Sequence, residues 1–222
     1  MSTIADWNEW HHQYDDPDSE LSHRSRLVRE QVVAAVDAMP PGPVTVVSIC
    51  GGQGLELIGA LADHPRRTDV RGRLVELDER NAEIAREGTR VAGIDGLEVL
   101  QGDASASDSY AGLPRADLVI LSGVFGHLAP ADRRTLIGAL PQICGSGGKV
   151  VLTTYEVQPE RTEELRAIFG AVGFEEIDDT LTPGRTFGII VEQLQAAEEP
   201  FVAGASLFEF GSSHPGSAGH GD

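Results

Sequence analysis

Lysine is nearly absent from this chain of 222 residues, in which Lys149 is the only one. A phosphate-binding loop of the Gly-Lys-Ser/Thr kind needs a hydroxyl residue directly after its lysine, but Lys149 is followed by Val150. A Schiff base with pyridoxal phosphate would have to use Lys149, which stands at the start of a predicted strand. We therefore expect neither of these two chemistries.

Cysteine, positive charge and long apolar runs are also scarce. Cys50 and Cys144 are too few for a disulfide framework or a tetrahedral metal cluster, so no metal site is expected. A net charge of −18 opposes nucleic-acid and anionic-membrane partners. No apolar run approaches the roughly 20 residues that span a bilayer, and Met1-Ser2-Thr3 opens no secretory signal. We expect a cytoplasmic protein whose oligomeric state, a homodimer included, stays open.

Apolar runs and helical patterns alternate along most of the chain. An N-terminal helix with Leu21, Val28, Val32 and Val36 on one face ends at the prolines of residues 40–43. The strands that we predict after it are residues 44–49, 73–77, 97–101, 116–122, 150–154, 174–177 and 187–191. This alternation predicts an α/β fold, a doubly wound, mostly parallel seven-stranded sheet with helices on both faces. The last two strands predict an antiparallel hairpin at one edge.

A glycine-rich turn followed by an acid is the most informative pattern in the sequence. The apolar run 46–49 leads through Cys50 into Gly51, Gly52 and Gly54, and Glu76 ends the next apolar run. Glycines let a ligand approach the backbone closely, and such an acid accepts hydrogen bonds from ribose hydroxyls. The spacing favours a nucleotide-like ligand over the carboxyl ends of two parallel strands. A strand-to-helix turn that binds nothing is the alternative.

Six segments resemble the class I S-adenosylmethionine-dependent methyltransferases of the small-molecule type, in the order that this family has them. They are residues 48–54, 74–78, 101–104, 116–125, 145–150 and 171–174. The resemblance covers about residues 44–192 and implies a Rossmann-like methyltransferase fold. It implies that residues 44–210 form the cofactor-binding domain and that residues 1–43 add an aromatic lid and a helix to it. The glycine, serine and histidine of residues 211–222 predict a disordered tail. The implied reaction is in-line methyl transfer to an O, N or C atom of a small-molecule acceptor.

The resemblance also assigns cofactor contacts to S-adenosylmethionine. These implied contacts are Gly51, Gly52 and Gly54 at the methionine and sugar, Glu76 at the ribose, Leu77 and Asp103 at the adenine, Ala104 through its backbone, and Ser122 and Gly123 near the reactive methyl. Asp103 could instead cap a helix, and Ser122-Gly123 could be a plain turn.

Two positions depart from the family pattern. Ser48 stands where the family usually has an acid, and Cys50 stands where it usually has its first glycine. Glu56 is able to replace part of the missing negative charge, although an acid early in a helix also complements the helix dipole. Recognition of the methionine end is therefore the open question of this site.

Three further residues are candidates for catalysis. Tyr14 and His12 lie in an aromatic segment that resembles a lid excluding water from the cofactor, or that packs a helix onto the core. His127, beyond the fourth strand, is our candidate base, and an ordinary loop histidine is the alternative.

Two other functions remain as alternatives. One is a protein that binds S-adenosylmethionine without transferring methyl groups. The other is an NAD-dependent oxidoreductase, which fits less well because Leu57 stands where the dinucleotide fingerprint has a third glycine.

Overall fold

Seven strands form one twisted sheet. The computed structural model describes residues 16–209, so the predicted aromatic segment from Trp7 to Tyr14 and the tail 211–222 lie outside the described residues. The strands are β1 (Val44–Ile49), β2 (Val70–Glu76), β3 (Gly96–Gln101), β4 (Ala116–Leu121), β5 (Cys144–Tyr155), β6 (Phe174–Leu181) and β7 (Phe187–Leu194). Their order is β3-β2-β1-β4-β5-β7-β6, and β7 runs in the direction opposite to the other six strands. The predicted fold class, edge hairpin included, is confirmed.

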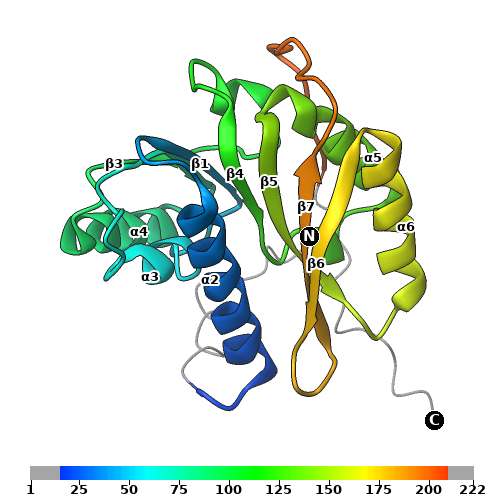
Figure 1. Ribbon diagram of the computed structural model, residues 1–222, viewed down its shortest axis with the longest axis horizontal. Coiled ribbons are helices and arrows are strands. Elements are labelled where there is room, and N and C mark those ends of the chain that lie inside the picture. Colours follow the sequence, from blue (N-terminus) through cyan, green and yellow to red (C-terminus); the bar gives the residue numbers. More distant parts are fainter. Residues whose placement is uncertain (1–15, 210–222) are drawn as a thin grey trace, which may run out of the picture.

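Helices cover both faces of the sheet (Figure 1). They are α2 (Glu20–Ala38), α3 (Leu57–Leu61), α4 (Glu79–Ala92), α5 (Pro130–Ala139) and α6 (Pro159–Ala171), with short 3₁₀ turns η2 (Ser107–Tyr110), η3 (Phe125–His127) and η4 (Leu140–Gln142). One buried apolar cluster joins α2, α3 and α4 to Val46 and Leu74, and the other joins α5 and α6 to Val47 and Val75. No helix within residues 16–209 has the length and apolar character to cross a membrane.

The fifth strand is longer than the sequence predicts. It begins at Cys144 rather than Val150, because Gly145 to Gly148 continue the strand as an irregularity instead of ending the element before it. The register with β4 shifts between Ala116 and Leu118, and a Cβ on Gly148 would meet the Ala116 carbonyl oxygen at 2.7 Å. Glycine is needed here for close backbone approach, as is usual at a bulge.

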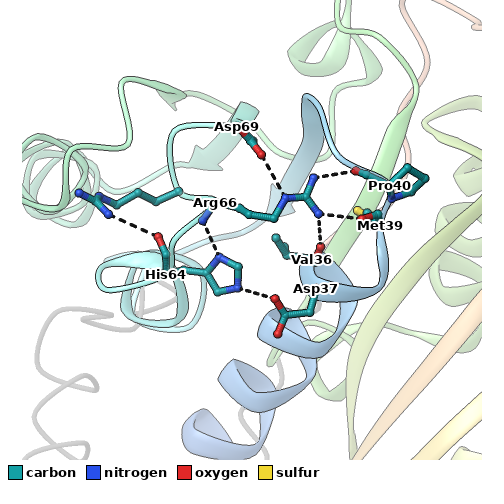
Figure 2. A network of polar contacts seen from close by, with 8 residues as sticks. Val36, Asp37, Met39, Pro40, His64, Arg66 and Asp69 are labelled. Carbon is teal, nitrogen blue, oxygen red and sulfur yellow. Dashed lines mark hydrogen bonds and ion pairs between the residues drawn. The ribbon is translucent and has the colours of Figure 1, made fainter.

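Helix α2 is fixed at its C-terminal end by one arginine (Figure 2). The Arg66 guanidinium donates from Nη1 to the carbonyl oxygens of Val36 and Met39, from Nη2 to those of Pro40 and Gly42, and from Nε to the Asp69 carboxylate. All five of its N–H donors are therefore used. The other end of the helix begins at Ser19, whose side chain accepts a hydrogen bond from the Ser22 amide.

The segment that follows β7 returns to the loop after β3. Leu207 and Phe208 are buried in the α5–α6 cluster. The Leu207 amide donates to the Ser105 carbonyl oxygen at 2.7 Å, and Ala106 and Ser206 form an isolated antiparallel bridge. The loop that carries Asp103 is thus held in place from the C-terminal side of the chain.

Candidate functional site

The strand order reverses between β1 and β4, and the loops that leave the carboxyl ends of these strands diverge there. In open α/β sheets, ligands bind in the crevice at such a switch point. The predicted cofactor residues all lie at this edge, because they follow β1, β2, β3 and β4. A separate cavity of about 240 Å³ lies near the amino ends of β4 and β5. Its lining includes Tyr110, Leu113, Ile143 and Phe201 and none of the predicted site residues.

The turn after β1 has an unusual backbone. Cys50, Gly52 and Gly54 have φ angles of 54°, 56° and 75°, in the left-handed region that L residues seldom adopt. A Cβ on Gly51 would lie 2.4 Å from Leu74 Cγ, and one on Gly54 would lie 2.4 Å from Ile58 Cδ1. A side chain at Gly51 would displace the buried Leu74, and the left-handed φ of Gly54 favours glycine there, while Cys50 accepts a conformation that glycine adopts more readily.

Glu76 connects this turn to the next one. Its side chain is buried, and its Oε2 accepts a hydrogen bond from the Gly52 amide while its Oε1 accepts one from the Asp78 amide, both at 2.9 Å. A carboxylate has about four lone-pair positions, so two remain for hydroxyl donors of a ligand. Asp78 itself caps α4 by accepting from the Arg80 and Asn81 amides.

Leu77 is an apolar side chain on the surface beside this buried acid. It is 68 % exposed, although residues 74 to 76 before it are buried. The turn between β2 and α4 therefore presents an apolar surface directly next to a carboxylate. A flat apolar ring attached to a sugar would meet both groups.

Asp103 follows β3 and stabilises its own turn. Its Oδ1 accepts hydrogen bonds from the Ser105 amide at 2.8 Å and the Ser105 hydroxyl at 2.7 Å. Asp103 therefore caps its own turn rather than a helix, since η2 begins only at Ser107. Oδ2 accepts no hydrogen bond within the described part of the chain. The neighbouring Ala104 is buried, and its carbonyl oxygen accepts from the Tyr110 hydroxyl.

Glu76 and Asp103 both lie near enough to Cys50 to affect the pKa of its thiol. Burial, and then the negative charges of Glu76 and Asp103, raise the pKa of the Cys50 thiol above its usual range. Cys50 is therefore protonated and a poor nucleophile at neutral pH. The two acids, which lie 27 positions apart in the sequence, face one local environment at the β1 turn.

The exit of β4 is held by side chains from three other elements. The Ser122 hydroxyl donates to Glu56 Oε1 at 3.3 Å, and the Gly123 amide donates to Thr153 Oγ1 on β5 at 2.8 Å. Glu56 also lies 3.8 Å from Arg24 of α2. The sequence reading missed Arg24 and Thr153, although Arg24 shares the spacing of the apolar positions on the buried face of α2.

His127 ends the 3₁₀ turn η3 just beyond this exit and is half-buried. It is therefore on the correct side of the sheet for the role that we predict, and its chemistry stays a prediction. Tyr14 and His12, the other catalytic candidates, lie outside residues 16–209, so their positions stay predictions as well.

Comparison with known proteins identifies the fold. No protein-family model and no curated protein matches the sequence. The magnesium protoporphyrin IX methyltransferase of Synechocystis PCC 6803, with S-adenosylmethionine bound, matches with a TM-score of 0.65 and 17% identity, over 85% of this chain and 90% of that chain. The N-methyltransferase NodS of Bradyrhizobium japonicum WM9 matches with a TM-score of 0.58 and 11% identity, over 82% and 100%.

A third solved structure, an O-methyltransferase family protein from Burkholderia thailandensis, matches with a TM-score of 0.60 and 17% identity, over 86% of this chain and 64% of that chain. At such low identities the likeness concerns the fold. The fold that the sequence resemblance implies, that of class I methyltransferases, is confirmed.

Proposed function

We propose that this chain, which has the fold of class I methyltransferases, transfers a methyl group from S-adenosylmethionine to an O, N or C atom of a small-molecule acceptor. One observation carries the proposal: the loops after β1 to β4 lie at one end of the sheet, beside the switch point, and they present a left-handed turn, a buried acid and an exposed leucine. These are the features that a nucleoside-type ligand requires.

The residues of this edge fit the cofactor. Glu76 has acceptor positions for the ribose hydroxyls, Leu77 offers the adenine an apolar surface, and Asp103 Oδ2 faces no competing donor among the described residues. Gly51, Gly52, Gly54 and Ala104 would contribute backbone contacts. S-adenosylmethionine supplies the activated methyl group when it is bound.

Transfer requires placement more than it requires acid–base chemistry. Ser122 and Gly123, which β5 and Glu56 hold in place, would border the methyl group and the acceptor. We assign to His127 the removal of the acceptor proton, where the acceptor carries one. Tyr14 and His12 would close the site against water.

A small metabolite is the acceptor that the composition favours. The net charge of −18 disfavours nucleic acid, because the phosphates of nucleic acids bind clustered lysine and arginine. We keep the proposal of one cytoplasmic domain with an N-terminal lid.

Incubation with methyl-labelled S-adenosylmethionine and a panel of small phenols, amines and activated carbon acids tests the proposal by mass spectrometry. We expect label on at least one acceptor. For His127→Ala we expect turnover to fall by about 10²-fold or more with cofactor affinity unchanged, since proton transfer contributes about that much. Undiminished turnover would remove His127 as the base.

A protein that binds the cofactor without methyl transfer is the second candidate. Ser48 and the left-handed Cys50 favour it, because both alter the motif at the methionine end. Cofactor binding without label on any acceptor of the panel would support this alternative. An NAD-dependent enzyme is disfavoured by Leu57 and by β7, which lies antiparallel between β5 and β6, unlike the order of the dinucleotide fold.

A further inference from the structure

A nearly buried ion pair joins helix α2 to the glycine turn. Arg24 Nη2 lies 3.8 Å from Glu56 Oε1, and the two side chains are only 5 % and 13 % exposed. That separation is longer than a hydrogen bond, so charge rather than a shared proton relates the two groups. Removing two charges from water costs free energy, which makes such a pair weak evidence for stability and invites another explanation.

The pair stands at the exit of β4. Glu56 accepts the hydrogen bond of the Ser122 hydroxyl, and the Cβ position of Gly123 lies 3.6 Å from Arg24 Nη1. The Arg24 guanidinium also lies over the Phe187 ring, 5.3 Å from its centroid, which orients it. Both charges therefore border the place where the reactive end of the cofactor would lie.

The position of Ser48 gives a reason for this arrangement. Side chains alternate between the two faces along a strand, so Ser48 shares with Val46 the face that packs against α2 and α3. Arg24 comes from α2, and Glu56 directly precedes α3. The negative charge that the motif lacks at residue 48 is thus available from Glu56, and Arg24 adds a positive charge from the same face.

We propose that Arg24 binds the carboxylate and Glu56 the ammonium group of the amino-acid end of S-adenosylmethionine. A zwitterion presents one charge of each sign, and the pair offers the matching charge to both. This assignment rests on the proposed function. It makes Arg24 and Glu56 residues that select cofactors with an amino-acid end over simple nucleosides.

Calorimetry with two ligands separates this role from a structural one. S-adenosylhomocysteine carries the amino-acid end, whereas 5′-methylthioadenosine keeps the adenosine and sulfur and lacks it. For Arg24→Gln and for Glu56→Gln we expect the affinity for S-adenosylhomocysteine to fall by about tenfold or more, as for the loss of a charged hydrogen bond. The affinity for 5′-methylthioadenosine should change less than about twofold.

Decarboxylated S-adenosylmethionine assigns the two charges individually. This ligand keeps the amine and lacks the carboxylate. Glu56→Gln should therefore lower the affinity for it by about tenfold, whereas Arg24→Gln should leave that affinity nearly unchanged. Arg26→Gln is the matched control, because Arg26 lies on the same helix with its side chain 58 % exposed. Its affinities for all of these ligands should equal those of the wild type.

Equal losses for S-adenosylhomocysteine and 5′-methylthioadenosine would show that the pair only supports the fold, and unchanged affinities would also overturn the assignment. If Arg24→Gln does not fold, the double variant Arg24→Gln/Glu56→Gln, which leaves no lone buried charge, gives the same comparison. A wild-type chain that binds none of the ligands would overturn the proposed function itself.

Discussion

Cys50 has a strained backbone conformation and an unreactive thiol. It has a φ of 54° at a position where the family that the sequence resembles has glycine, and such a conformation costs about 1–3 kcal/mol. Burial and nearby acids raise the pKa of its thiol, so the strained position carries no reactive thiolate. The strain is located at the turn that faces Glu76, where sites that bind ligands often store it.

Glu192 on β7 is a buried acid that weakens the fold when it ionises. Burial first, and then the charge of Glu176 directly opposite on β6, raise the pKa of Glu192 from 4.5 to about 7, against the opposing effect of Arg166. Between these two pH values the folded chain holds a proton that the unfolded chain has lost. Stability from this group is therefore lost as pH rises from about 4.5 through about 7.

Replacement by a neutral residue tests this effect. We expect Glu192→Gln to be more stable than wild type at pH 8 by roughly 2–3 kcal/mol and about equal to it near pH 4.5, as measured by urea unfolding. Glu175→Gln, at an exposed position on β6, is the control and should show no such pH-dependent difference. The same stability difference for Glu192→Gln at both pH values would refute the assignment.

The C-terminal end of helix α2 is stabilised by one side chain, that of Arg66. Arg66 donates to four carbonyl oxygens at the end of this helix and in the turn after it, and Figure 2 shows those of Val36, Met39 and Pro40. We expect Arg66→Met to lower the free energy of unfolding by about 2–4 kcal/mol, because these carbonyls lose charged partners. Arg66→Lys, with three donors in place of five, should lose roughly 1–2 kcal/mol.

Urea unfolding measures both changes, with Arg26→Met as an exposed control on the same helix. A loss below about 0.5 kcal/mol for Arg66→Met would show that water replaces these hydrogen bonds at no cost.

Most elements were predictable because their apolar patterns are local. β1 and β4 are rich in β-branched and apolar residues and are buried on both faces along most of their length, and the sequence places them within one residue of their observed bounds. The glycines before Val150 were misread as a break, because a bulge and a loop have the same local composition. Only the pairing with β4 distinguishes the two.

The site residues that could be predicted are those that belong to a recognisable sequence motif. The turn of Gly52 and the acid Glu76 were expected to meet, and a 2.9 Å hydrogen bond joins them. Arg24 was not predicted, since its nearness to Glu56 depends on how α2 packs over the sheet. Packing between distant segments leaves no signal in the spacing of residues along the chain.

The whole molecule is a scaffold that brings four loops to one edge of the sheet. Helices on both faces fix the strands (Figure 1). The segment after β7 holds the loop that carries Asp103. Residues from separate parts of the chain, from Gly52 to Gly123, thereby lie at the carboxyl ends of neighbouring strands. A ligand that bridges the loops should therefore stabilise the entire domain.

Titration calorimetry with S-adenosylmethionine, S-adenosylhomocysteine and NAD tests this account most directly, in the wild type and in Glu76→Gln. We predict that both sulfur compounds bind at one site per chain, that NAD does not, and that Glu76→Gln weakens the binding by about tenfold, as expected for the loss of charged hydrogen bonds to the ribose. Tight binding of NAD with no binding of either sulfur compound would contradict the account.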